Sequence, residues 1–183
     1  MFRLVAIVGL AGSGKSEVVK AFEAAGFTKI YFGGLTIEKL KEANFEINEP
    51  NERMMREKLR RDHGMAAYAT LNLPKIKEGL KKVSIIIDGL YSWEEYLVLK
   101  KEFPALEVVA VQASPKIRYQ RLTTRPIRPL TKAEAESRDY AQIENLHQAG
   151  PIVMANRTII NEGSLAELEK QVSLILGEKN GKN

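Results

Sequence analysis

The chain has 183 residues, of which 44% are hydrophobic and 28% are charged, and this is the balance of one globular domain with a full core. It contains no cysteine, which excludes a disulfide framework, a thiolate zinc site and a cysteine nucleophile. The formal net charge of +5 attracts anions such as phosphates and nucleotides.

Five apolar runs rich in Val and Ile predict the strands of the fold. The runs are continuous rather than alternating, which is typical of parallel strands that are covered on both faces. In chain order they are Leu4–Val8, Lys29–Phe32, Val83–Asp88, Glu107–Gln112 and Arg157–Ile160. Helical segments separate them, so we expect right-handed βαβ units in an α/β fold, arranged as a three-layer α/β/α sandwich.

Helices are predicted between and after these strands. In chain order they are Ser16–Ala25, Asn51–Asp62, Met65–Lys81, Ser92–Phe103, Ser114–Thr124, Thr131–His147 and Ser164–Leu176. Gly26 is the expected C′ residue of the first helix, and Pro74 is expected to break or kink the third. Capping boxes are predicted at Ser92/Glu95, Thr131/Glu134 and Ser164/Glu167. We find no repeat or linker, so residues 1–176 form one predicted domain, followed by a flexible tail at 177–183.

The segment from Gly9 to Ser16 matches the phosphate-binding pattern G-x-x-x-x-G-K-[ST] at every fixed position, between a predicted strand and a predicted helix. Glycines let such a loop curl so that its N–H groups point at phosphate oxygens, and the helix adds the partial positive charge of its N-terminus. Lys15 is expected to reach the β- and γ-phosphates, and the Ser16 hydroxyl to bind Mg²⁺. The predicted nucleotide-binding residues here are Gly9, Ala11, Gly12, Ser13, Gly14, Lys15, Ser16 and Glu17. The alternative is a glycine-rich turn that binds nothing.

Two further segments narrow the class of P-loop protein. A GTPase reads its base with Asn-Lys-x-Asp after a late strand, and the matching segment 161–164 reads Asn-Glu-Gly-Ser, without the lysine and the aspartate. Asp88 ends a predicted buried strand before Gly89, at the edge where open α/β sheets bind ligands. Asp88 is therefore predicted to hold Mg²⁺ through water or to contact the acceptor, and the alternative is a solvent-facing turn residue. What remains is a small kinase.

Two groups of arginines are candidates for binding phosphate. Arg118, Arg121 and Arg125 fall at i, i+3 and i+7, on one face of a predicted helix that leads into a closing lid. Guanidinium groups there would neutralise the charge that builds up during phosphoryl transfer. The second group lies on an earlier helix and, with Asp88 and Gly89, forms the predicted acceptor site: Arg53, Arg56 and Arg60. The alternative for both groups is a solvated basic helix face.

Several segments together carry a resemblance that covers nearly the whole chain. They are Gly9–Ser16, Leu59–Met65, Ile87–Gly89, Ala113–Pro115 with Arg121 and Arg125, Arg138-Asp139, and Ile160–Leu165. On these segments the sequence resembles the superfamily of dephospho-CoA kinases and nucleoside monophosphate kinases. It is most similar to a dephospho-CoA-kinase-like branch, of which the Asn-x-Gly-Ser-Leu ending is typical.

The resemblance implies a five-stranded parallel sheet in the order 2-3-1-4-5, an acceptor-binding helical segment at about 35–81 and a mobile lid at about 121–140. It implies ATP with Mg²⁺ as the phosphoryl donor, arginines in the lid, and an adenine-lining loop near Asn161 and Gly163. The predicted catalytic residues are then Lys15, Asp88, Arg121, Arg125 and Arg138.

The segment after the second strand departs from the pattern of these kinases. Relatives commonly carry Gly-Asp there, with an arginine shortly beyond, to orient the acceptor. In this chain Gly34 stands where the carboxylate is expected and Ile37 where the arginine is expected. A phosphate acceptor is less affected than a hydroxyl acceptor, because its oxygen is already anionic and needs little help from a base. The departure therefore favours a nucleotide acceptor.

The sequence thus predicts an ATP-dependent phosphotransferase that moves the γ-phosphate of ATP to a small nucleotide-like acceptor, such as a nucleoside monophosphate or dephospho-CoA. The alternative is an ATP-binding regulatory protein that has lost catalysis, with Gly34 and Ile37 as the relevant changes. Nucleic acid is not an expected partner, because aromatic and basic residues do not interleave. No stretch reaches the ~20 apolar residues that span a bilayer, so we expect a cytoplasmic protein, as a monomer or a homodimer.

Overall fold

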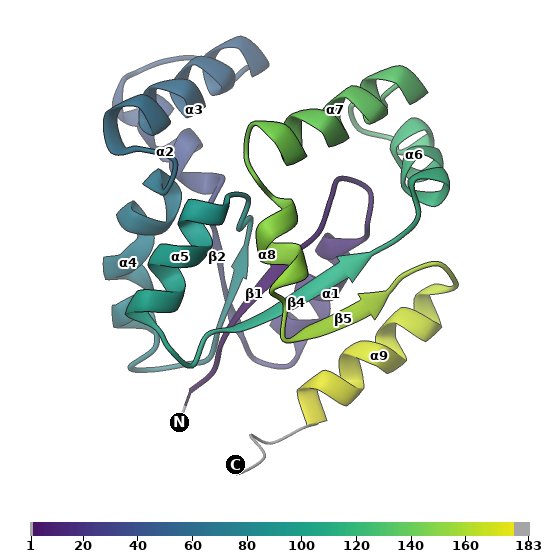
Figure 1. The fold of residues 1–183 in the computed structure, drawn as a ribbon. Coiled ribbons are helices and arrows are strands. Elements are labelled where there is room, and N and C mark those ends of the chain that lie inside the picture. Colours follow the sequence, from purple (N-terminus) through teal and green to yellow (C-terminus); the bar gives the residue numbers. More distant parts are fainter. Residues whose placement is uncertain (1, 178–183) are drawn as a thin grey trace.

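The computed structural model describes residues 2–177 and shows a parallel sheet with helices packed on both of its faces (Figure 1). The strands are β1 (Leu4–Val8), β2 (Thr28–Tyr31), β3 (Ile85–Asp88), β4 (Glu107–Gln112) and β5 (Arg157–Ile160). They pair in parallel, in the order β2-β3-β1-β4-β5. The α/β class and the strand order 2-3-1-4-5 are therefore confirmed. The predicted tail at 178–183 lies outside the described residues.

The helices are α1 (Lys15–Ala24), α2 (Gly34–Glu42), α3 (Glu49–His63), α4 (Ala67–Gly79), α5 (Trp93–Glu102), α6 (Pro115–Thr124), α7 (Lys132–Glu144), α8 (Ala149–Val153) and α9 (Leu165–Gly177). The sequence did not predict α2 and α8. Helix α2 begins with Gly34, and the short helix α8 contains Gly150 and Pro151. Helix α4 runs through Pro74, so the predicted break there is wrong, and the kink stays a prediction. Thr70, four residues earlier, is exposed, so water can reach this side of the helix. No helix within residues 2–177 has the length and apolar character that a membrane crossing needs.

The central strands are buried on both faces, and their side chains alternate between two hydrophobic clusters. Ala6 and Ile87 point into the cluster formed with α3, α4 and α5, whereas Ile7 points into the cluster formed with α1 and α9. In the edge strands only Ile30 of β2 and Ile159 of β5 are buried, so the prediction of coverage on both faces is wrong there. The flanking helices lie over the middle of the sheet and leave its margins exposed to solvent.

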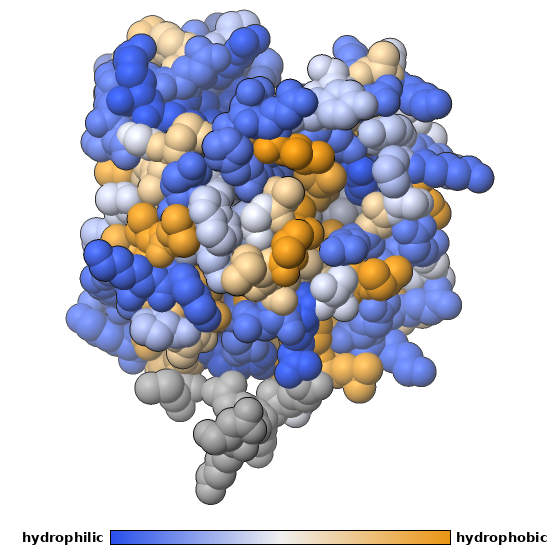
Figure 2. Space-filling view, in the orientation of Figure 1, coloured by the Kyte–Doolittle hydropathy of each residue, from blue (hydrophilic) through white to orange (hydrophobic). Residues whose placement is uncertain are grey.

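The parallel strands bring their carboxyl ends to the same edge of the sheet. Ile7 of β1 lies beside Asp88 of β3, and Gln112 of β4 lies beside Ile160 of β5. The loops that follow these strands therefore meet at this edge, where open α/β sheets bind ligands. Helices α3 and α7 rise beyond the edge on two sides (Figure 1). In the space-filling view a notch separates the surface over α3 from that over α7, and most of the surface around it is hydrophilic (Figure 2).

Candidate active site

The loop between β1 and α1 is shaped by glycines. Gly9, Gly12 and Gly14 have φ values of 146°, 78° and 98°, in the left-handed region that favours glycine. A Cβ at Gly12 would lie 2.7 Å from the carbonyl oxygen of Arg118, and a Cβ at Gly14 would collide with Asn161 Nδ2. Neighbouring elements thus press against the loop so closely that no side chain fits at these positions.

Lys15, the first residue of α1, folds its side chain back over the loop. Its Nζ donates hydrogen bonds to the carbonyl oxygens of Gly9 (2.7 Å) and Leu10 (2.9 Å). Burial lowers the pKa of Lys15 to about 8, against the opposing effect of the Asp88 carboxylate. Burial in turn raises the pKa of Asp88, and Lys15 opposes that effect. The predicted catalytic residues Lys15 and Asp88 therefore lie within electrostatic reach of each other, at the carboxyl edge of the sheet.

Two buried polar atoms beside the loop have no hydrogen-bond partner within the described part of the chain, Ser13 Oγ and Arg121 Nη1. The other terminal nitrogen of Arg121 donates to Asn161 Oδ1 (3.4 Å), and Asn161 Nδ2 donates to the carbonyl oxygen of Ser13 (2.8 Å). Arg121, predicted as a lid arginine, and Asn161, predicted to line the adenine, are thus both held against the loop. Buried polar atoms are seldom left unpaired in folded proteins, so these two fit a site for an anionic ligand.

The residues expected to hold Mg²⁺ fit that ion through their chemistry. Ser16 is exposed on the first turn of α1, and Asp88 ends β3 with its side chain partly buried. Residues 2–177 contain no group of three His, Cys, Asp or Glu side chains that could hold a metal ion by themselves. Mg²⁺ at a phosphate site needs only one or two protein oxygens, because phosphates and water supply the rest. Glu17, by contrast, is exposed and pairs with Lys20 at 2.9 Å.

A depression of about 500 Å³ follows β5, at the place where the adenine is expected. Its walls include Asn161 and Gly163, together with residues of the first turns of α9. Glu167 Oε2 accepts a hydrogen bond from the Ser164 N–H at 2.7 Å, which confirms the capping box at the start of that helix. The predicted adenine loop therefore lies next to the phosphate loop, to which Asn161 connects it.

A cavity of about 860 Å³ lies between α3 and the segment from 125 to 146. Arginine and tyrosine side chains dominate its walls, which consist of Tyr31, Gly33, Thr36, Ile37, Glu49, Glu52, Arg53, Arg56, Arg60, Tyr68, Tyr91, Arg125, Arg128, Leu130, Arg138, Ala141, Gln142, Asn145 and Leu146. The predicted acceptor residues Arg53, Arg56 and Arg60 are among them, and the cavity brings them together with two predicted lid arginines. Asp88 and Gly89 do not line this cavity.

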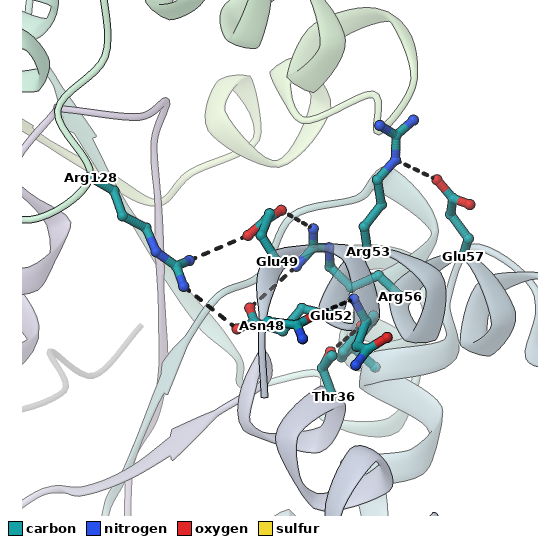
Figure 3. Close-up of polar contacts among 10 residues, drawn as sticks. Thr36, Asn48, Glu49, Glu52, Arg53, Arg56, Glu57 and Arg128 are labelled. Carbon is teal, nitrogen blue, oxygen red and sulfur yellow. Dashed lines mark hydrogen bonds and ion pairs between the residues drawn. The ribbon is translucent and has the colours of Figure 1, made fainter. Parts of the chain in front are cut away.

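The arginines of the cavity differ in their partners (Figure 3). Arg53 points away from the others and pairs with Glu57 at 2.9 Å. Arg56 pairs with Glu49 at 2.8 Å, and Arg128 reaches the same carboxylate from the opposite wall at 3.3 Å. The hydrogen bond from Arg56 holds the pKa of Glu49 below its usual range.

Arg60 is the cavity arginine with an unused buried donor. Its Nε is buried without a hydrogen-bond partner among the described residues, and its guanidinium lies over the Tyr68 ring, 5.3 Å from the ring centroid. The Tyr68 hydroxyl is in turn hydrogen-bonded to Thr36 Oγ1 at 2.7 Å. The Arg60 guanidinium is thus oriented by the Tyr68 ring and keeps an unused N–H donor, which fits the binding of an anionic ligand in the cavity.

The predicted basic face of Arg118, Arg121 and Arg125 is wrong. Helix α6 ends at Thr124, because the proline at 126 disfavours a helical conformation at Arg125. Arg125 is extended and its Nε donates to the Arg128 carbonyl oxygen at 2.7 Å. Arg118 is buried and forms two hydrogen bonds with Asp139 of α7, at 2.7 and 2.6 Å. Arg118 therefore joins α6 to α7, and its Nη1 also donates to the Ala11 carbonyl oxygen of the loop at 3.2 Å. Arg121 differs from it, because its buried Nη1 beside the loop has no hydrogen-bond partner among the described residues.

Other residues at the site were not predicted to act there. Gln142 and Gln148 bond to the phosphate loop, and the tyrosines and Glu49 form walls of the cavity. One signal was available for Gln142, because it follows Arg138 by four residues and so shares its face of the helix. Gln148 lies in a short connection that had no recognisable pattern.

The parallel sheet, the glycine loop with Lys15 and the helical cover beside it together define the fold of P-loop kinases. A family profile described as an AAA domain (AAA_18) matches residues 5–145. The chain is also 32% identical over 178 residues to a UPF0200 protein of Thermococcus gammatolerans, an alignment that covers 94% of this chain and 93% of that one. The chain therefore belongs to the AAA_18 family, among proteins of the UPF0200 group.

Solved structures show the same fold at low sequence identity. TT1252 from Thermus thermophilus is similar with a TM-score of 0.65 and 17% identity, over 98% of this chain and 99% of that one. A gluconokinase from Sinorhizobium meliloti has a TM-score of 0.59 and 15% identity, with 95% and 91% covered. A shikimate kinase from Bacteroides thetaiotaomicron has a TM-score of 0.59 and 15% identity, with 94% and 96% covered. None of these relatives identifies the dephospho-CoA kinase branch.

Proposed function

We propose that the protein is an ATP- and Mg²⁺-dependent phosphotransferase that moves the γ-phosphate of ATP to a small phosphorylated acceptor, such as a nucleoside monophosphate or dephospho-CoA. The observation that carries the proposal is the position of an arginine-lined cavity beside an intact phosphate loop, with Gln142 contacting both. A kinase needs these two sites side by side, because the acceptor oxygen must reach the terminal phosphorus in line with the leaving group.

In this proposal the loop N–H groups bind the phosphate chain, and Lys15 exchanges the carbonyl oxygens of Gly9 and Leu10 for phosphate oxygens. Arg121 offers the same charge its Nη1, which has no hydrogen-bond partner within residues 2–177. Ser16 and Asp88 would hold Mg²⁺, which when bound neutralises phosphate charge. The acceptor oxygen forms a bond to the γ-phosphorus while the bond to the bridging oxygen breaks, and ADP leaves with that electron pair.

The walls of the cavity support an acceptor whose nucleophile is a phosphate oxygen. The acidic residues that line it are Glu49 and Glu52, and each pairs with both Arg56 and Arg128. The hydrogen bond from Arg56 lowers the pKa of Glu49 and so makes it a weak base. Glu52 is engaged by two guanidiniums, and Gly34 supplies no carboxylate at the start of α2. A phosphate oxygen needs no proton removed, so it suits this cavity better than a hydroxyl group does.

The proposal is tested by incubating the full chain with ATP and Mg²⁺ against a panel of acceptors, with products identified by mass spectrometry. The panel contains ribo- and deoxynucleoside monophosphates, dephospho-CoA, gluconate and shikimate. We expect transfer to a phosphorylated member of the panel. Binding of ATP in a thermal shift assay without transfer to any acceptor would favour the regulatory alternative, and absence of both would contradict the site itself.

The lowered pKa of Lys15 predicts a pH dependence of nucleotide binding. Phosphates favour the charged ammonium, so binding raises this pKa from about 8 and takes up protons where the free lysine is neutral. Affinity for ADP should therefore be steady below pH 8 and fall about tenfold between pH 8 and pH 9.5. Calorimetry in buffers with different ionisation enthalpies measures both the affinity and the proton uptake. Lys15→Met should show no such proton uptake, and a flat profile in the unmodified protein would refute the assignment.

Arg60 should contribute more to acceptor binding than its neighbours on α3. Arg60→Ala removes a buried donor that has no partner within the described chain, and a charge-assisted hydrogen bond to phosphate contributes about 1.5–3 kcal/mol. We therefore expect KM for the acceptor to rise about 10- to 100-fold, with KM for ATP changed much less. Arg61→Ala is the matched control, since Arg61 is exposed and pairs with Asp62 outside the cavity. Equal effects of the two substitutions on the acceptor KM would argue against this role.

A further inference from the structure

Two buried glutamines connect the phosphate loop to the end of α7, which we call the lid helix because it contains the C-terminal part of the predicted lid. Gln142 lies in the last turns of α7, and Gln148 lies in the connection to α8; their exposed fractions are 8% and 0%. Gln142 Nε2 donates to Gln148 Oε1, and the Gln148 N–H donates to the Gln142 carbonyl oxygen at 3.1 Å. His147, with a φ of 52°, forms the tight turn between them. The two amides are therefore fixed relative to each other by both side chain and main chain.

Each glutamine bonds to a main-chain group of the loop. The Ala11 N–H donates to Gln142 Oε1 at 3.2 Å, and Gln148 Nε2 donates to the Gly9 carbonyl oxygen at 3.2 Å. The same Gly9 oxygen accepts a hydrogen bond from Lys15. The glutamine pair thus shares one acceptor with the lysine that binds phosphate and occupies one N–H donor of the phosphate loop.

The lid holds Ala11 through its other main-chain group as well. Arg118 Nη1 donates to the Ala11 carbonyl oxygen at 3.2 Å, and the buried pair of Arg118 and Asp139 joins α6 to α7. Asp139 and Gln142 are three residues apart on α7, so one face of this helix is directed at the loop. Buried and partly buried hydrogen bonds thus connect residues 9–11 to α6 and α7.

The adjacent side of the same helix segment lines the cavity. Gln142 is one of the residues that line the cavity, and so is Arg138, one helical turn before it. Gln142 consequently stands at the boundary between the phosphate loop and the proposed acceptor site. Through Gln142, binding at the phosphate loop can change the position of Arg138 in the cavity.

We infer that Gln142, oriented by Gln148, is a positioning residue that couples occupancy of the phosphate loop to the conformation of lid helix α7 and its arginine in the cavity. This inference rests on the proposed nucleotide binding at the loop. Arrival of the terminal phosphate withdraws Lys15 from Gly9 and offers a competing acceptor to the Ala11 N–H. Gln142 carries that change into α7, so that Arg138 takes its working position only when the donor nucleotide is bound.

Hydrogen exchange of α7 tests the coupling. The full chain is compared with Gln142→Leu, each with and without Mg²⁺ and a non-hydrolysable ATP analogue at saturation, and exchange is followed over residues 132–144. In the unmodified protein we expect the analogue to change exchange in the second half of α7 by about 3- to 10-fold, the range of one net hydrogen bond. In Gln142→Leu the analogue should still bind by calorimetry, and the change in α7 should disappear. The amide signal of Ala11 in ¹⁵N NMR spectra should also move in the variant without nucleotide, because it has lost its acceptor.

Two variants separate this role from a merely structural one. Gln142→Glu keeps an oxygen for the Ala11 N–H and should restore the Ala11 signal and part of the response of α7. Gln120→Leu makes the same exchange of side chain at an exposed position of α6 and should behave like the unmodified protein. The inference is overturned if the response of α7 survives in Gln142→Leu, or if the analogue binds the unmodified protein without changing α7. Failure of the proposed function gives a different result, namely no binding of the analogue by calorimetry to any of the proteins.

Discussion

Replacing Lys15 by alanine should lower kcat for phosphoryl transfer by orders of magnitude while the protein remains folded. Lys15 contributes the ammonium group closest to the phosphate loop, and no described residue bonded to the loop offers an equivalent charge at Gly9 and Leu10. Loss of one preorganised donor at developing charge lowers kcat by about 10²–10³-fold in enzymes of this kind. We expect a decrease of at least that size in kcat for Lys15→Ala, together with weaker binding of ATP in calorimetry.

The folded state should tolerate this substitution. Lys15 is partly buried in the free protein and desolvation lowers its pKa, so its removal relieves a desolvation cost. The Gly9 carbonyl oxygen also keeps its bond from Gln148. Lys20→Ala is the matched control, because Lys20 lies on the same helix, is exposed and pairs with Glu17 at 2.9 Å. Undiminished nucleotide binding by Lys15→Ala would remove the basis of the proposed function.

Much of the fold could be predicted because its signals are local. The continuous apolar run of Leu4–Val8 followed by Gly9 predicts a buried strand that enters a phosphate loop, and the structure has both. The strand order followed from the resemblance to P-loop kinases and not from the apolar pattern, since a run such as Ile85–Asp88 carries no information about its neighbours. Helix α2 was missed because Gly33 and Gly34 are poor helix formers, and only tertiary packing of Leu35 and Leu40 makes this segment helical.

The site was harder to predict than the fold, because burial decides what an arginine does. Arg118 and Arg121 look alike in the sequence, yet Arg118 is bound to Asp139, 21 residues away, whereas Arg121 has a buried donor at the loop that no described residue accepts. Arg53 and Arg60 differ in the same way, since the Arg53 side chain points outward and pairs with Glu57, whereas the Arg60 guanidinium lies over the Tyr68 ring. Spacing along a helix places such residues on a face, but it does not tell which face becomes covered.

The buried ion pair between Arg118 and Asp139 should give the largest loss of stability among single substitutions at the site. The two side chains are 4% and 8% exposed and form two hydrogen bonds, and the Tyr119 hydroxyl donates to the same carboxylate at 3.0 Å. Asp139→Leu would leave the guanidinium charged, buried and unpaired, which costs about 3–5 kcal/mol in the free energy of unfolding. Equilibrium unfolding in urea, followed by circular dichroism, measures this change.

A double substitution distinguishes the unpaired charge from a general loss of packing. The double variant Arg118→Met with Asp139→Leu leaves neither charge of this pair buried. It should therefore unfold at a higher urea concentration than Asp139→Leu alone. This is expected even though the carbonyl oxygens of Ala11 and Ala113 lose the hydrogen bonds that Arg118 donates to them. The exposed pair of Lys58 and Asp62 provides the comparison, and Asp62→Ala should change the free energy of unfolding by no more than about 0.5 kcal/mol. If the double variant were as unstable as Asp139→Leu, the cost would lie in lost packing between α6 and α7. The link from α6 and α7 to Ala11 would then depend on the shape of these helices rather than on the charge of Arg118.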